Sequence, residues 1–229
     1  MSQLLSLLRI YLSAAILCSI APVSNRLASY INTIAFTSAF GLTLALYFTG
    51  TSYFFEIQWF ESASNPFYLN FQIYPKQLPL LLFTTLTAAL VAIYSSVYFD
   101  SKTSNIRFFQ TLGFFMFSMM GLLLSANLFL TFIFWELVGL SSYLLIGYYR
   151  ESREAGLAAL KAMLLNKTGD AAFLIGLLLC WNIFGSFNLN TLSTATTSDG
   201  TLGLFLGLTI FFAITAKSAQ VPLHGWLAD

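Results

Sequence analysis

Long apolar runs, each about the length that crosses a bilayer, dominate the chain. A helix needs about 20 apolar residues to span a hydrocarbon core of roughly 30 Å. Reading for such runs predicts seven transmembrane segments. They cover Leu4–Ala21, Leu27–Phe48, Gln77–Phe99, Phe108–Leu124, Leu128–Tyr149, Ala155–Phe184 and Thr201–Lys217. Pro222 follows the last run, and its missing N–H and its ring favour a break there. We therefore expect a discontinuous seventh helix that continues as a short piece past the proline.

The segment between the second and third runs has a different periodicity. Apolar and polar side chains alternate over 55–59 and again over 69–73, on either side of the turn-like stretch Glu61–Pro66. Alternation of period two around a turn predicts a β-hairpin. Because an open sheet edge cannot face lipid, we expect this hairpin on the membrane surface or against a partner. The Ser/Thr-rich stretch Asn190–Gly200 is expected to be the other long loop.

Composition agrees with this pattern. The chain has 229 residues, of which 58% are hydrophobic and 8% charged, whereas a soluble domain carries about 25% charged residues. The sequence therefore predicts an all-α integral membrane protein that has lipid around it. A net charge of +1 argues against binding nucleic acid. With His224 as the single histidine, no cluster of protein histidines can hold a metal. Cys18 and Cys180 lie in apolar runs, as small buried side chains do.

The basic residues of the connecting loops predict an orientation. The side richer in basic residues should hold Arg26, Lys102, Arg107, Arg150 and Arg153. The other side carries at most Arg9 and Lys76. Lysine and arginine accumulate on the negative side of a membrane. The N-terminus and the hairpin then face the positive side, and the C-terminus faces the matrix or the cytoplasm.

Several ionisable residues interrupt the apolar runs. They are Glu136, Lys161, Lys167, Asp170 and Lys217. Placing a charge at the bilayer centre costs at least about 2.5–3.5 kcal/mol, so such residues usually serve ion or proton movement. Glu136 lies about nine residues into its run, or ~14 Å, close to the middle of the membrane. It should be either protonated or paired with a cation. A structural ion pair that fixes helix register is the alternative.

The charges of the sixth run leave alternatives open. Lys167 and Asp170 are three residues apart, so they share a helix face and are expected to pair. Their role is either structural or conducting. Lys161 is either a proton relay or a structural counter-ion of Glu136.

Lys217 stands beside the expected helix break. It follows an apolar run without an acidic neighbour and precedes Pro222 by five residues. A broken helix leaves unpaired carbonyls and room for water at membrane depth. A lysine in such a place can load and unload a proton. The alternative is that Lys217 caps the negative end of the helix dipole. His224 either passes protons at the break or is structural.

Two stretches carry a family resemblance. Phe134–Tyr148 with Ala158–Asp170, and then Ala216–Asp229, closely resemble the chain-5 family of the proton-pumping NADH:ubiquinone oxidoreductase, respiratory complex I. The wider family holds the other antiporter-like subunits and the Mrp-type antiporters. The resemblance is dense from about Phe108 onward and weaker before it.

The resemblance implies roles for single residues. Glu136 and Lys217 match the proton-loading pair of the first half-channel. Lys161, Lys167 and Asp170 match charged positions that line or support it. It also implies that no cofactor is bound in this chain, because NADH, FMN, iron–sulfur clusters and ubiquinone belong elsewhere in the complex. The chain would carry proton translocation, not redox chemistry, within an NADH:ubiquinone reductase.

The family's chains continue where this sequence stops. They go on to an eighth helix with a proton-relay residue and to a second, inverted repeat. We expect 1–229 to be one membrane domain, with N-terminal helices and the hairpin in 1–107 and an incomplete antiporter-like repeat in 108–229. The favoured expectation is a split subunit that a second polypeptide completes. Truncation, or a half retained for structure only, are the alternatives.

The expected partners are the other complex I membrane subunits. A composition with 24 Phe favours the mitochondrial inner membrane over a bacterial plasma membrane or a thylakoid. Two other functions stay open: a subunit of a cation/proton antiporter, and a non-conducting structural subunit of a membrane arm.

Overall fold

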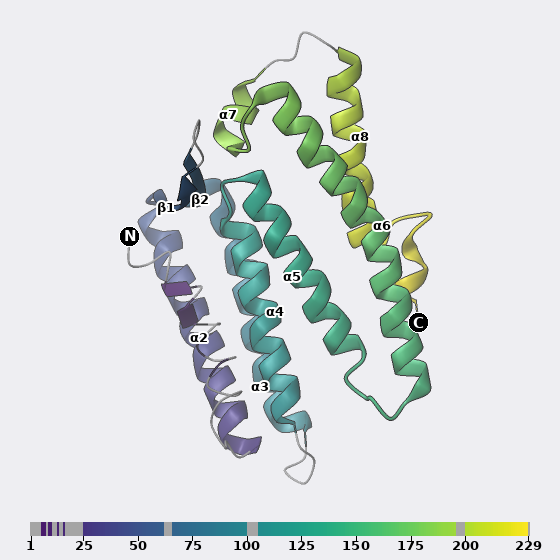
Figure 1. Ribbon diagram of the computed structural model, residues 1–229. Coiled ribbons are helices and arrows are strands. Elements are labelled where there is room, and N and C mark those ends of the chain that lie inside the picture. The colour runs from purple at the N-terminus through teal and green to yellow at the C-terminus, as the bar shows by residue number, and fades with distance from the viewer. Residues whose placement is uncertain are drawn as a thin grey trace. The chain divides into compact units, whose positions relative to one another are not determined.

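Helices and one hairpin make up the computed structural model (Figure 1). It describes residues 25–61, 66–99, 105–195 and 200–228, and a few single residues before 25. The longer elements are α2 (Asn25–Thr49), β1 (Tyr53–Glu61), β2 (Pro66–Ile73), α3 (Leu78–Tyr98), α4 (Ile106–Leu124), α5 (Leu128–Ile146), α6 (Arg153–Phe184), α7 (Leu189–Thr194) and α8 (Gly200–Lys217). Two short 3-10 turns are η1 (Pro75–Gln77) and η2 (His224–Trp226).

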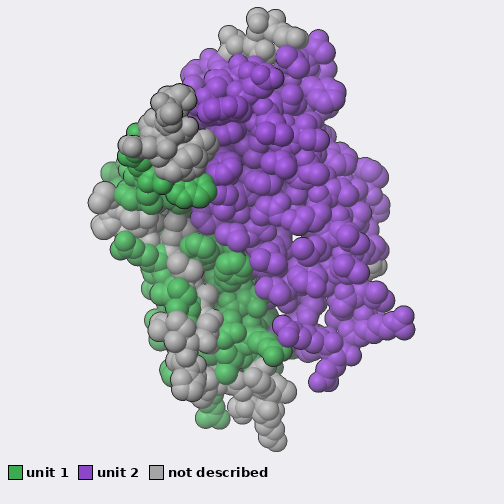
Figure 2. Space-filling view, in the orientation of Figure 1, with its two compact units in different colours: residues 1–125 green, residues 126–229 purple. Residues whose placement is uncertain are grey.

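Six described helices are long and apolar enough to cross a membrane, namely α2, α3, α4, α5, α6 and α8. They confirm six of the seven predicted spans, with ends that coincide or differ by at most three residues. The first predicted span, Leu4–Ala21, lies largely outside the described residues. The chain divides into two compact units, residues 1–125 and 126–229 (Figure 2).

In the first unit the predicted hairpin is confirmed. β1 and β2 pair antiparallel, with Tyr53 opposite Ile73 and an irregularity between Gln58 and Phe60. Phe71 forms an isolated bridge to Ser125 at the end of α4, so the hairpin is tied to that helix. Helix α2 packs along α3. The buried face of α3 repeats every three or four residues and is made of Leu78, Leu81, Thr85, Ala88, Ala89, Ala92 and Ser95.

Local capping explains where the helices of the second unit begin and end. The Asn127 side chain accepts hydrogen bonds from the backbone N–H groups of Phe129 and Leu130, which starts α5. Ser152 caps the start of α6 in the same way. Helix α6 ends at Gly185, which has a φ of 62° and the left-handed conformation that glycine adopts without strain.

Glycines bring α6 and α8 close together. A Cβ added at Gly169 would lie 2.5 Å from the Cβ of Ala216 and 3.3 Å from the carbonyl oxygen of Ala213. A Cβ at Gly176 would lie 2.9 Å from the side chain of Ile210. Transmembrane helices associate through such small residues, because lipid supplies no hydrophobic drive between them. The approach fixes the height of the C-terminal end of α8 against α6.

The expected loop Asn190–Gly200 begins as a helix instead. α7 occupies its first residues, and the side chain of Asn188 caps that helix by accepting from the N–H of Asn190. The backbone N–H of Leu189 also donates to the carbonyl of Ala126. Ser and Thr weaken helices only slightly, and a good cap with an anchored start outweighs them over a single short helix.

The predicted break after α8 is confirmed, although the carbonyls of Thr215 and Ala216 at the helix end are hydrogen-bonded. The N–H of Gln220 donates to the carbonyl of Thr215, and that of Ala219 donates to Ala216, the pairing of a Schellman motif. Ala219 has a φ of 51°, as that motif requires. The indole N–H of Trp226 in η2 also donates to the carbonyl of Ala216. The chain therefore folds back on the end of α8 and pairs the carbonyls of Thr215 and Ala216.

Candidate functional site

Four of the predicted charges form one row across α5, α6 and α8. Lys167 on α6 forms an ion pair with Glu136 on α5. The Lys167 Nζ lies 3.3 Å from Oδ2 of Asp170, one turn further along α6. The Nζ of Lys217, at the end of α8, lies 3.9 Å from Oδ1 of Asp170. The order is acid, base, acid, base, so each inner charge has an opposite charge on both sides.

Asp170 is the buried centre of this row. Its side chain is 5% exposed, whereas that of Lys167 is 45% exposed. The indole N–H of Trp135 donates to its Oδ1 at 2.8 Å. Both carboxylate oxygens are thus engaged, Oδ2 by Lys167 and Oδ1 by Trp135 with Lys217 nearby. A buried carboxylate needs this degree of pairing and hydrogen bonding to stay ionised.

Lys217 reaches away from its own helix. Its ammonium donates to the backbone carbonyl of Trp135 at 2.9 Å and lies 5.1 Å from the centroid of the Trp135 ring. It therefore contacts α5 instead of the carbonyls that end α8, which disfavours the helix-cap alternative. Gly139, one turn further along α5, has no side chain in the way: a Cβ there would lie 2.8 Å from the lysine nitrogen.

Glu136 and Lys217, which the resemblance matches to a proton-loading pair, are not joined by an ion pair in the described structure. Among the described residues, Glu136 forms its ion pair with Lys167, while the acid within 4 Å of Lys217 is Asp170. The reason is the position of α6, which packs against both α5 and α8. The predicted pairing of Lys167 with Asp170 is confirmed. The roles of all four in proton transfer stay predictions.

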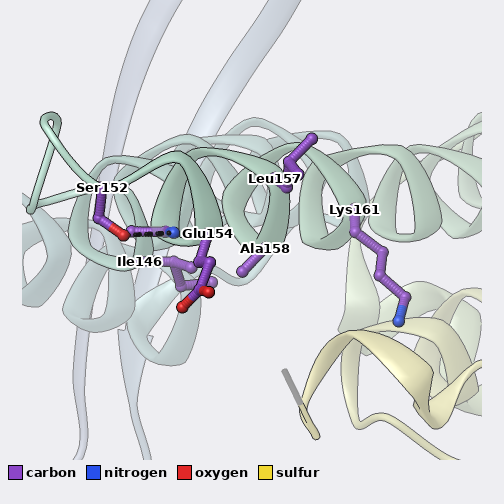
Figure 3. A pocket seen from close by; sticks show the side chains of 7 residues that line it. Ile146, Ser152, Glu154, Leu157, Ala158 and Lys161 are labelled. Carbon is purple, nitrogen blue, oxygen red and sulfur yellow. Dashed lines mark hydrogen bonds between the residues drawn. The ribbon is translucent and has the colours of Figure 1, made fainter.

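The ion pairs that define the row include neither Lys161 nor His224. Lys161 lies about 1.7 helical turns before Lys167, and its side chain extends toward the C-terminal segment, 3.8 Å from the position of a Cβ built on Gly225 (Figure 3). It lines a cavity of about 620 Å³ at the start of α6. Glu136 forms an ion pair with Lys167, and both roles considered for Lys161, proton relay and counter-ion, stay predictions. His224 is exposed in η2.

Two residues of the site have no charge and were missed in the sequence. They are Trp135 and Gly139 on α5, which contact Lys217 and, through the indole, Asp170. The sequence did contain a signal for them. Gly139 follows Trp135 by four residues, so no side chain covers the Trp135 carbonyl on that face of the helix. Cys180, as expected, is a buried free thiol in the described part of the chain.

The fold and the row of charges define a polytopic helical membrane protein with ionisable groups between its helices. A family model described as "NADH:quinone oxidoreductase/Mrp antiporter, TM" matches residues 125–229. Residues 125–229 are therefore similar to that family of membrane domains, and subunits 5 of NAD(P)H-quinone oxidoreductases are among the homologues of the chain.

Three curated relatives are examples. Subunit 5 of the Paulinella chromatophora chromatophore is 39% identical over 75% of this chain and 27% of its own length. Chloroplast subunit 5 of Mesostigma viride is 37% identical over 78% of this chain and 28% of its own length. Chain 5 of Synechocystis is 36% identical, again over 78% of this chain and 27% of its own length. The chain spans little more than a quarter of the length of these relatives.

Two solved structures share the fold. The Mrp complex from Dietzia contains a chain that matches with a TM-score of 0.87 and 21% identity, over 99% of this chain and 25% of that one. A chain of the archaeal membrane-bound sulfane sulfur reductase matches with a TM-score of 0.77 and 20% identity, over 98% of this chain and 46% of that one. This chain therefore shares its membrane fold with one chain of each of these two complexes.

Proposed function

We propose that this chain is a proton-translocating membrane subunit of an NAD(P)H:quinone oxidoreductase of the complex I type. The observation that carries the proposal is the row Glu136–Lys167–Asp170–Lys217, which lies within helices apolar enough to cross a membrane. Ionisable groups in that setting are costly to keep and mark ion or proton paths. Homology to subunit 5 of NAD(P)H-quinone oxidoreductases supports the type of complex that we propose.

The proposed mechanism is electrostatic and uses Asp170 as a shared partner. When Lys167 pairs with Glu136 alone and leaves Asp170, the charge of Asp170 is available to hold Lys217 protonated. When Lys167 moves onto Asp170, Lys217 loses part of that support and passes its proton on. The two arrangements differ by a swing of one flexible lysine side chain, whose Nζ already lies 3.3 Å from Asp170. Lys161 and His224 are assigned to the proton path, before and after the step in which Lys167 changes partner.

Further parts of the proposal concern the assembly. Redox chemistry, with NADH, FMN, iron–sulfur clusters and ubiquinone, is assigned to other subunits, and this chain is assigned no cofactor. Its partners are the other membrane subunits of the complex and a second polypeptide that supplies the remaining helices. The mitochondrial inner membrane is the proposed location, although curated relatives occur in chloroplasts and cyanobacteria. The intact mass of the subunit in the native complex tests the division into two polypeptides.

A cation/proton antiporter subunit is the second candidate, and the shared fold with the Mrp complex favours it. Sodium- or potassium-dependent proton flux in vesicles without a quinone reductase would support this candidate against the first. The absence of any proton pumping in vesicles that contain neither sodium nor potassium would also support the antiporter candidate.

The test uses the native complex in sealed membrane vesicles. We expect Lys217→Ala and Glu136→Gln to reduce proton pumping far more than electron transfer. Lys76→Ala is the matched control, since this lysine is exposed in η1. Normal pumping in both Lys217→Ala and Glu136→Gln would overturn the proposal and would support a non-conducting structural role.

A further inference from the structure

The α5 surface that receives Lys217 forms a specific seat for its ammonium group. We propose that Trp135 and Gly139 are positioning residues that hold Lys217 at rest on a neutral carbonyl and an indole face, beside Asp170 but not bonded to it. This inference rests on the proposed function, because it assigns the resting position of the lysine that is proposed to release the proton.

The carbonyl of the seat is open because residue 139 is glycine. A helical carbonyl is bonded to the N–H four residues later, and the side chain at that later position flanks it. At Gly139 no side chain is present, and the Lys217 ammonium donates to the Trp135 carbonyl at 2.9 Å. A Cβ at residue 139 would lie 2.8 Å from the lysine nitrogen. Any other residue at 139 would therefore displace the ammonium.

The indole of Trp135 keeps Asp170 and Lys217 apart. Its N–H occupies Oδ1 of Asp170 at 2.8 Å, and the same oxygen is 3.9 Å from the lysine nitrogen. A direct charge-assisted hydrogen bond would be about 2.7–2.9 Å long. The indole ring is itself fixed edge-on against buried Phe173, with centroids 5.2 Å apart and planes at 89°. The seat is thus built on a side chain that packing holds in place.

The chemistry of the seat suits a group that has to move. The carbonyl stabilises the ammonium through its dipole, and the aromatic ring does so through its quadrupole. Both interactions are weaker than that with a full opposite charge at the same distance. Lys217 can then leave without first breaking a hydrogen-bonded ion pair. Without the indole N–H, or with a Cβ at 139, the shortest alternative for the ammonium is a direct bond to Asp170.

Gly139→Ala is the decisive variant. Alanine has a higher helix propensity than glycine, and the atom it would meet is the far end of a flexible lysine side chain, so the helix should fold and the complex assemble. Gly156→Ala on α6 is the matched control, because a Cβ there meets nothing within 4 Å. We expect Gly139→Ala to slow proton pumping roughly tenfold, the effect of losing a hydrogen bond to a charged group, and Gly156→Ala to pump normally.

Trp135→Phe tests the indole separately, since it keeps a ring and the backbone carbonyl but removes the N–H. We expect slower pumping at unchanged subunit content and a pH profile of pumping that departs from the parent's. A density map of the Gly139→Ala complex should place Lys217 on Asp170. The inference is overturned when Gly139→Ala and Trp135→Phe pump like Gly156→Ala while Lys217→Ala does not. Normal pumping by Lys217→Ala itself would instead overturn the proposed function.

Discussion

The carboxylate of Asp170 lies 3.9 Å from the ammonium of Lys217, so an α6 residue is the acidic neighbour of this lysine in the described structure. The same carboxylate is 3.3 Å from Lys167. One buried acid thus serves two bases, and Glu136 competes for one of them. An arrangement of this kind transmits a change at Glu136 to Lys217 without contact between the two, through a chain of ionic contacts.

Asp170→Asn should be the most damaging single change in the row. Asparagine still accepts from Trp135 but leaves Glu136 as the one remaining acid of the row for Lys167 and Lys217. Removing one partner of a buried ion pair costs on the order of 3 kcal/mol or more. We expect less assembled complex in the membrane and little pumping by what assembles, measured by immunoblot of native gels and by dye quenching in vesicles. Glu151→Gln, at an exposed acid before α6, is the control. Equal pumping in the two variants would contradict the central place of Asp170.

Glu136 and Lys167 should act as a unit. A double-mutant cycle with Glu136→Gln and Lys167→Met should give a coupling of about 0.5–3 kcal/mol in the pumping rate, the range found for residues in one network. The double variant should then pump no worse than the worse single variant. Additive losses would mean that the two residues work in separate steps. Glu136→Gln combined with Lys76→Ala gives the additive reference, because Lys76 lies in the other compact unit.

Gly169 should tolerate no side chain. Alanine there would bring its Cβ to 2.5 Å from Ala216 and 3.3 Å from the Ala213 backbone, so α8 would have to move as a whole. Overpacking of this kind typically costs about 1–3 kcal/mol. We expect Gly169→Ala to lower the thermal stability of the detergent-solubilised complex. Gly207→Ala on α8, where a Cβ meets nothing within 4 Å, should leave it unchanged or slightly raised. A stable Gly169→Ala complex would show that the two helices can separate at no cost.

The sequence predicted the elements of this fold well and the contacts of the site only in part. Apolar runs and period-two alternation specify helices and a hairpin through local physics, so α2 to α6, α8 and the break near Pro222 were predictable. The pairing of Glu136 with Lys167 was not, because it depends on which helix packs between the others. Trp135 and Gly139 were missed because they act through a backbone carbonyl and an absent side chain, and neither gives a charge pattern in the sequence.

Ala219 should accept glycine and reject valine. Its φ of 51° lies in the left-handed region, which costs a residue with a Cβ about 1–2 kcal/mol. Glycine removes that strain but loses more backbone entropy on folding, about 0.5–1 kcal/mol, so Ala219→Gly should be neutral to mildly stabilising. A β-branched valine is a genuine outlier at positive φ, and Ala219→Val should disturb the Schellman turn that returns the chain toward α8 and positions Trp226. We expect lower thermal stability and slower pumping for the valine variant and parent-like values for the glycine variant. Parent-like behaviour of both would mean that the turn after Lys217 does not constrain the site.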